Sequence, residues 1–169
     1  ALAPPSNLTY SLNPASYVTA TAIAANTPAS QGGAVASYSV APALPAGLTL
    51  NASTGVITGT PTTKTAAASY IVTATNGAGS ATASLSIAVF TKVRAVFGLS
   101  PASGVAPLVV AFSDSSQGDF TRRVWTFGDG SADSAFASNS NFSHTFNTAI
   151  TYTVKLTVSG AGGIDTLSK

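Results

Sequence analysis

The stretch Val124-Trp125-Thr126-Phe127-Gly128-Asp129-Gly130-Ser131 holds the one tryptophan of the chain. Trp125 and Phe127 occupy alternate positions, as residues on one face of a strand do, so both are predicted to point into a hydrophobic core. The Gly-Asp-Gly that follows is typical of a sharp turn, since aspartate caps backbone N–H groups and glycine adopts positive φ angles. We therefore interpret Asp129 as a turn residue, with a calcium ligand as the alternative.

The rest of the chain shows the same alternation in many short runs. Helical periodicity is absent, and clusters of Gly, Pro, Asn and Ser divide the sequence at intervals of roughly 8–12 residues, which is typical of all-β sandwiches. From Tyr70 to Ala74, every second side chain is predicted to face inward. The run that begins at Tyr152 repeats this pattern about 80 residues later, again followed by a glycine-rich turn. The sequence thus predicts an all-β protein of two tandem Ig-like β-sandwich domains, residues 1–91 and 92–169.

Tyr70 and Tyr152 open the two repeated runs. Ig-like folds often place a tyrosine at this point, with its ring in the core and its hydroxyl bonded to an upstream backbone group. Both residues are in phase with the inward positions, which favours such a tyrosine corner over an exposed tyrosine that binds a sugar or a peptide.

The composition excludes several classes of function. Seven Lys and Arg against five Asp give a net charge of +2, too little for the basic stripe of a nucleic-acid-binding protein. The pair Arg122-Arg123 is predicted to lie on a solvated turn or strand face, and residues 1–90 carry one charged side chain, Lys64. Without cysteine the chain has neither disulfides nor thiolate zinc sites. No apolar run reaches the roughly 18 residues that predict insertion into a membrane.

Residues 44–62 read LPAGLTLNASTGVITGTPT. Pro45-Ala46-Gly47 bends the chain into a short strand, and Ser53-Thr54-Gly55 is predicted to form a hairpin turn in which glycine supplies a positive φ. This stretch resembles the putative-Ig (He_PIG) family, a cadherin-like sandwich of bacterial surface proteins, and the resemblance extends over residues 4–90. It implies that the first domain belongs to an extracellular or cell-surface protein of bacterial origin.

The second half resembles a polycystic kidney disease (PKD) repeat. The matching stretches are SPASGVAPL at 100–108, WTFGDGS at 125–131, SHTF at 143–146 and YTVKLTV at 152–158. The family usually has aspartate after the tryptophan, where this chain has Thr126, and glycine two residues before the tyrosine, where it has Ile150. The first difference removes a carboxylate, and the second implies a different turn before the strand.

Calcium is the cofactor to consider for the acidic residues, because some PKD-like and cadherin-like modules bind it. The ion takes six to eight oxygen ligands, and the first domain has no carboxylate side chain, whereas Asp129 and Asp133 are close enough in sequence to reach one ion. A weak calcium site at these two residues stays an alternative to our expectation of no cofactor. Enzyme activity is not predicted, because His144 is the one histidine and no serine lies in a Gly-x-Ser-x-Gly motif.

We expect a non-catalytic structural or adhesive tandem that acts as a spacer or stalk in a secreted or cell-surface protein, with other domains of the same polypeptide as its partners. Two alternatives stay open. One is self-association into a fibre or surface array, because the chain has few charged side chains to prevent edge-to-edge pairing of strands. The other is an accessory module of an extracellular enzyme that binds polysaccharide or an extracellular matrix protein. That module would need exposed aromatic side chains, for which the candidates are Tyr17, Tyr38, Phe120 and Phe136.

Overall fold

The computed structural model describes residues 2–136 and 141–169. The secondary structure in this part consists of β-strands, and no helix among these residues is long and apolar enough to cross a membrane. The chain divides into two compact parts, unit 1 (Ala1–Thr91) and unit 2 (Lys92–Lys169). Each unit buries its own hydrophobic core between layers of strands. The predicted all-β class with two Ig-like domains is therefore confirmed.

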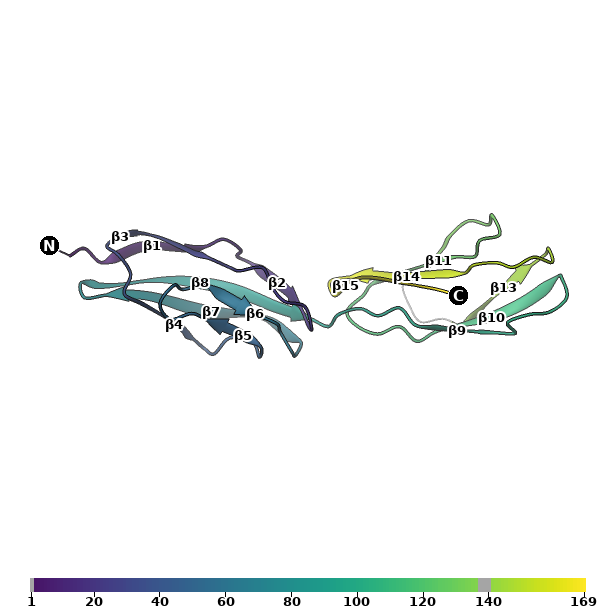
Figure 1. The fold of residues 1–169 in the computed structure, drawn as a ribbon, viewed down its shortest axis with the longest axis horizontal. Coiled ribbons are helices and arrows are strands. Elements are labelled where there is room, and N and C mark those ends of the chain that lie inside the picture. Colours follow the sequence, from purple (N-terminus) through teal and green to yellow (C-terminus); the bar gives the residue numbers. More distant parts are fainter. Residues whose placement is uncertain (1, 137–140) are drawn as a thin grey trace. The chain divides into compact units, whose positions relative to one another are not determined.

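Unit 1 is a sandwich with one large sheet (Figure 1). Its strands are β1 (Pro5–Tyr10), β2 (Ala15–Val18), β3 (Pro28–Gly32), β4 (Ser37–Ala41), β5 (Leu48–Leu50), β6 (Ile57–Gly59), β7 (Thr65–Asn76) and β8 (Gly79–Phe90). The large sheet has the order β2–β8–β7–β4, with β2 parallel to β8 and the other pairs antiparallel. The pairs β1–β3 and β5–β6 form the rest of the sandwich, and a bridge links Asn26, just before β3, to Ile57 in β6.

The long hairpin of β7 and β8 shows why the alternating sequence gives a sandwich. Tyr70 pairs with Leu85 and Val72 with Ala83, and these side chains belong to the hydrophobic core or pack against it. The residues between them present mostly Ser and Thr hydroxyls to solvent. The predicted inward face of residues 70–74 is confirmed, because every second side chain there is buried.

The turn between β5 and β6 depends on one glycine. Asn51 begins the turn, and its side chain accepts hydrogen bonds from two of the turn's N–H groups at 2.9 and 3.0 Å. Gly55 has a φ of +71°, and a Cβ added there would lie 2.6 Å from the ring of Tyr38. The hydroxyl of Tyr10 donates to the Gly55 carbonyl at 2.6 Å. Both the backbone conformation and the packing therefore require glycine at the predicted turn.

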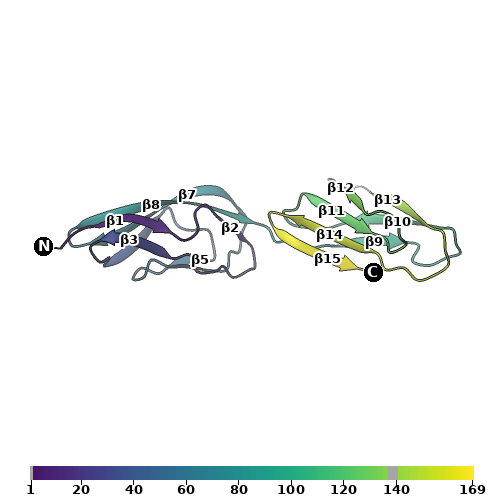
Figure 2. The same cartoon turned by 90° about the horizontal axis from the view of Figure 1, so that it is seen from above.

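Unit 2 combines a three-stranded and a four-stranded sheet (Figure 2). Its strands are β9 (Phe97–Ser100), β10 (Leu108–Asp114), β11 (Arg122–Thr126), β12 (Ser134–Phe136), β13 (Phe142–Phe146), β14 (Lys155–Gly160) and β15 (Gly163–Ser168). The sheets have the orders β13–β10–β9 and β12–β11–β14–β15, and their strands pair antiparallel.

Trp125 lies at the centre of the unit 2 core and is 1% exposed. Its ring meets those of Phe97, Phe112 and Phe142 edge-on, at centroid distances of 4.9, 5.5 and 5.1 Å. Phe127, on the same side of the chain, is 2% exposed. The prediction that these alternate residues anchor the core is confirmed, and edge-to-face contacts of this kind add to the stabilisation from burial.

The tyrosine corner is present in unit 2 but not in unit 1. Tyr152 donates its hydroxyl to the carbonyl of Thr148 at 2.9 Å. Tyr70 is buried, but within residues 2–136 and 141–169 its hydroxyl has no such upstream partner, so that part of the prediction is wrong. The reason is local: Tyr70 lies inside the 12-residue strand β7, whereas the chain before Tyr152 bends and brings a carbonyl back to the ring.

Candidate functional site

The Gly-Asp-Gly stretch after β11 forms the predicted sharp turn. Gly128 and Gly130 have φ angles of +75° and +82°. Asp129, between them, accepts hydrogen bonds on one carboxylate oxygen, Oδ1, from both the N–H and the hydroxyl of Ser131. A Cβ at Gly128 would also lie 2.8 Å from the carbonyl oxygen of Thr153. The turn is therefore closed by the aspartate and permitted by the glycines.

The other oxygen of Asp129 joins this turn to the opposite sheet. Asp129 Oδ2 lies 2.6 Å from Nε2 of His144, a residue of β13. The imidazole stacks on Phe127 with a centroid distance of 3.8 Å and an interplanar angle of 2°. It also meets the ring of Phe146 at 4.8 Å. The pair thus links the end of β11, in one sheet, to β13, in the other.

This serine, histidine and aspartate do not form a nucleophilic triad. In such a triad the histidine stands between the serine and the acid, whereas here Ser131 and His144 both bond to Asp129. The hydrogen bond from the Ser131 side chain, opposed by burial and supported by His144, lowers the pKa of Asp129 from 3.8 to about 2. A carboxylate with so low a pKa is a poor general base at neutral pH. The arrangement therefore serves to hold a turn.

The calcium candidates do not come together in a ligand cluster. Both oxygens of Asp129 already have partners within unit 2, and Asp133 is exposed. Across the part of the chain that the structure describes, no three His, Cys, Asp or Glu side chains gather as metal ligands would. Because calcium takes six to eight oxygens, the described residues supply little of the coordination that the ion needs.

The aromatic candidates for ligand binding pack against the two cores. Tyr38 is half-buried over Gly55 in unit 1. In unit 2, Phe120 lies under the guanidinium of Arg123 at 4.3 Å, and Phe136 stacks on Phe142 at a centroid distance of 5.0 Å. Tyr17, the fourth candidate, is 6% exposed and accepts a hydrogen bond from Asn26 through its hydroxyl. Within each unit, no ring contact among the described residues joins its two candidates to each other.

A buried ion pair in unit 2 corrects the prediction for Arg122-Arg123. Arg122 is exposed, but Arg123 is 8% exposed, and its Nε lies 2.6 Å from Oδ2 of Asp114 in β10. The expected solvated face therefore holds only for the first arginine. The sequence carried a signal, because residue 123 is in phase with the inward Trp125 and Phe127, and a buried arginine requires an acidic partner.

Comparison with protein families finds two matches along the chain. A model described as putative Ig domain matches residues 2–90, and a PKD domain model matches residues 100–169. These are the two kinds of domain that the sequence motifs resembled, in the predicted order. Domains of these kinds are generally non-catalytic and are typical of extracellular and cell-surface proteins. No curated protein matches the chain.

Several solved structures of tandem Ig domains share the fold. The N-terminal eight Ig domains of Down Syndrome Cell Adhesion Molecule superimpose with a TM-score of 0.70 at 16% identity, over 98% of this chain and 27% of that one. The extracellular domains 3–5 of Drosophila OTK give a TM-score of 0.56 at 15% identity, over 95% and 59% of the two chains. The titin I-band fragment I67–I69 gives 0.51 at 18% identity, over 99% and 65%. The chain spans less than two thirds of each, and at such identities the likeness shows the fold alone.

Proposed function

The chain belongs to the putative Ig domain family and carries a PKD domain after it, and on this basis we propose that it is a non-catalytic structural and adhesive tandem. Its role is that of a spacer or stalk within a secreted or cell-surface bacterial protein. Its partners are other domains of the same polypeptide, which it holds at a distance from a surface or from one another.

The observation that carries this proposal is the parallel pairing of β2 with β8. The pairing runs from Ala15 opposite Ile87 to Val18 opposite Phe90, and the N–H of Thr19 extends it with a 2.9 Å bond to the Phe90 carbonyl. When the two ends of unit 1 are pulled apart, the force reaches β2 from its N-terminal side and β8 from its C-terminal side. Because the two strands are parallel, they are then pulled past each other along their length. All hydrogen bonds of the ladder are then loaded together instead of opening one at a time. This geometry suits a module that bears tension.

Two further features support a spacer. The linker is short: the Phe90 carbonyl is bonded within unit 1, and the N–H of Val93 already donates to Gly162 within unit 2. A connection of this kind has little free length. The Asp129 turn and its neighbours also hold structure instead of presenting an activated nucleophile, which is consistent with a protein that has no catalytic activity.

Single-molecule force spectroscopy of the full chain, pulled from its two ends, tests the proposal. Thr19→Pro removes the N–H that bonds to the Phe90 carbonyl at 2.9 Å, and it is expected to lower the force at which unit 1 unfolds. Ala24→Pro, in the loop before β3, is the matched control, because it lies outside the β2–β8 ladder. Equal unfolding forces for the two variants would show that this ladder does not carry the load.

Self-association is the second candidate, favoured by the outer face of the large sheet in unit 1. The outward positions of β4, β7 and β8 carry no charged side chain and are mostly hydroxyls: Ser37, Ser39, Ser69, Thr73, Thr75, Ser80, Thr82, Ser84 and Ser86. Such a face offers little charge repulsion to oppose association with a second copy. Sedimentation velocity over a range of protein concentrations tests this. A sedimentation coefficient that stays at the value of a monomer at every concentration would exclude assembly through this face.

A further inference from the structure

The long strand β8 in unit 1 has an unpaired edge along its first half. On the side away from β7, β2 pairs with β8 only from Ile87 to Phe90, at the end of the strand that leads to unit 2 (Figure 1). From Gly79 to Ser84, no strand among the described residues pairs with this side of β8. Since β8 is 12 residues long, about half of it forms a sheet edge.

The side chain of Asn13 shows which backbone groups point outward from this edge. Its amide donates to the Ser84 carbonyl at 2.8 Å and accepts a hydrogen bond from the N–H of Ser86 at 3.0 Å. These groups of Ser84 and Ser86 therefore point away from β7. Because alternate residues of a strand direct their backbone groups to the same side, the N–H and C=O of Ser80 and Thr82 point outward as well. Among the described residues, no group is hydrogen-bonded to them.

The burial of the inward side chains of β8 follows the same division. Leu85 and Ile87, beside Asn13 and β2, are 0% exposed. Ala81 and Ala83, on the unpaired half, are only half-buried, although they pack against the same core. The unpaired edge therefore leaves some apolar surface open, and a strand added there would cover it.

This edge carries none of the features that usually prevent strands from pairing with another chain. Such features are charged side chains, proline, β-bulges and very short strands. Residues 79–86 read GSATASLS, without charge or proline, and they pair with β7 without a shift in register. The opposite edge of the sheet, β4, differs, because the N–H of Tyr38 is already bonded to the Ala52 carbonyl at 2.8 Å.

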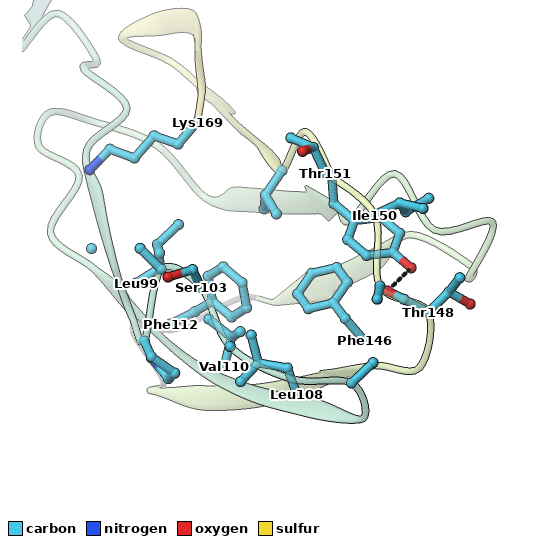
Figure 3. Close-up of a pocket in the computed structure, with 18 residues that line it drawn as sticks. Leu99, Ser103, Leu108, Val110, Phe112, Phe146, Thr148, Ile150, Thr151 and Lys169 are labelled. Carbon is cyan, nitrogen blue, oxygen red and sulfur yellow. Dashed lines mark hydrogen bonds between the residues drawn. The ribbon is translucent and has the colours of Figure 1, made fainter.

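The hollow at the surface of unit 2 presents less to a partner than this edge does. Val110, Phe112 and Phe146 line it (Figure 3), and these three side chains are at most 6% exposed. The hollow therefore offers little apolar surface at its base. The edge of β8, by contrast, offers backbone donors and acceptors that point in fixed directions.

We propose that the unpaired edge of β8 binds the same edge of a second copy of this chain, antiparallel and about a two-fold axis at Thr82. Thr82 then lies opposite Thr82 of the second copy, and the two residues exchange N–H···O=C bonds. Ser80 lies opposite Ser84 of the second copy in the same register. Each four-stranded sheet of unit 1 thereby continues into the other. A two-fold interface of this kind uses the same surface on both copies.

The distribution of charge favours a second copy as the occupant of this edge. Lys64 is the one charged side chain of residues 1–90. It directly precedes Thr65, which pairs with Val89, whereas Ser80 pairs with Thr75 at the other end of the hairpin. Two copies of unit 1 therefore meet at this edge without like charges close to the interface. The inference rests on the second candidate function, self-association, and assigns it to the edge of the sheet; it does not depend on the spacer role.

A concentration series of the full chain, followed by sedimentation velocity and by amide NMR, tests the pairing. The sedimentation coefficient is expected to rise from the value of a monomer to that of a dimer. The N–H signals of Ser80, Thr82 and Ser84 are expected to shift saturably, and those of Ala81 and Ala83, which face β7, to shift less. A chain that stays monomeric up to about 1 mM, an affinity worth only some 4 kcal/mol, would overturn both the edge pairing and the self-association candidate.

Substitutions at Thr82 and Thr73 separate pairing at the edge from association through the outer face. Thr82→Pro removes the N–H at the centre of the proposed interface, and the fold tolerates it because this N–H points away from β7. Thr82→Lys, as a second variant, places like charges directly opposite each other. Both are expected to weaken the dimer at least about tenfold. Thr73→Lys is the matched control, because Thr73 pairs with Thr82 on the same outer face but lies one strand away from the edge, so it is expected to leave the dimer intact.

The opposite pattern would refute the edge while keeping self-association. If Thr73→Lys abolishes the dimer and Thr82→Pro does not, the copies associate through the outer face. Equal effects of Thr82→Lys and Thr73→Lys would likewise contradict pairing at the edge. Near-UV circular dichroism of the tyrosines shows for each variant that unit 1 is folded.

Discussion

Replacing Asp129 by asparagine tests whether charge in the Gly-Asp-Gly turn stabilises unit 2. Asparagine keeps the oxygen that accepts the N–H of Ser131, but it removes the negative charge 2.6 Å from His144. The fall in the pKa of Asp129 from 3.8 to about 2 corresponds to roughly 2 kcal/mol if all of it is converted to stability. Because the turn is exposed and solvent screens such pairs, we expect a loss of about 0.5–1 kcal/mol at pH 7.

The stability that Asp129 contributes to unit 2 depends on pH. The pKa of Asp129 is lower in the folded protein, about 2, than its ordinary value of 3.8. Its contribution to stability is therefore complete above pH 3.8 and is lost as the pH falls towards 2. Urea unfolding followed by tryptophan fluorescence measures this for unit 2, since the one tryptophan, Trp125, is buried there. The difference between the original chain and Asp129→Asn is expected at pH 7 and to vanish near pH 2.

Asp133→Asn provides the control for Asp129→Asn. It removes the same charge from an exposed carboxylate four residues farther along the chain, so it changes the net charge of unit 2 equally without touching His144. If both substitutions destabilise unit 2 to the same extent, the pairing with His144 contributes nothing. If the deficit of Asp129→Asn persists unchanged at pH 2, its cause is the shape of the turn and not charge.

Two further substitutions and one binding assay test the stability and the proposed role of the two units. Gly55→Ala is expected to destabilise unit 1 by about 1–3 kcal/mol, because both the positive φ and the ring of Tyr38 oppose a Cβ; near-UV circular dichroism of the tyrosines follows the melt, and an unchanged midpoint would contradict the geometry. Arg123→Ala leaves Asp114, whose side chain is 2% exposed, as an unpaired buried charge and is expected to cost about 3–5 kcal/mol, whereas Arg123→Met combined with Asp114→Leu costs less. Urea unfolding separates the two, and equal costs would refute the importance of the pair. Incubation with insoluble polysaccharides and fibrous collagen, with calcium or a chelator, is expected to leave the protein in the supernatant; saturable loss onto one material would replace the spacer role with binding, and loss only with calcium would restore the acidic turn as a metal site.

The fold could be predicted because its signal is local. A strand with one face in a core and one in water needs apolar residues at every second position, and the run from Tyr70 shows this within a few residues. Trp125 and Phe127 follow the same rule, and the glycines beside Asp129 mark a turn without reference to the rest of the chain. These features depend on neighbouring residues alone, and all of them are confirmed.

The parts of the site that could not be predicted depend on contacts between strands. Asp129 and His144 each stood out in the sequence, but their pairing arises because β11 and β13 belong to different sheets that face each other. The phase of Arg123 with Trp125 indicates that it is buried, but its partner Asp114 could not be predicted, because it lies nine residues away on another strand. The missing corner at Tyr70 has a similar cause, since the path of the upstream chain decides whether a carbonyl reaches the hydroxyl. No spacing rule supplies that path.

The two units use different side chains to bind backbone groups that lie outside the regular strand ladders. In unit 1, neutral amides bind backbone groups outside the regular ladders: Asn26 bonds to both the N–H and the carbonyl of Leu12. In unit 2, carboxylates bind such groups: Asp165 accepts a hydrogen bond from the N–H of Ala95 at 2.8 Å. The two units therefore bind such backbone groups with different kinds of side chain. Burial raises the pKa of Tyr10 in unit 1 to about 12, so this group favours unfolding only above pH 10, where the unfolded chain ionises first. At acid pH the corresponding group is Asp129 in unit 2, whose pKa is lowered to about 2.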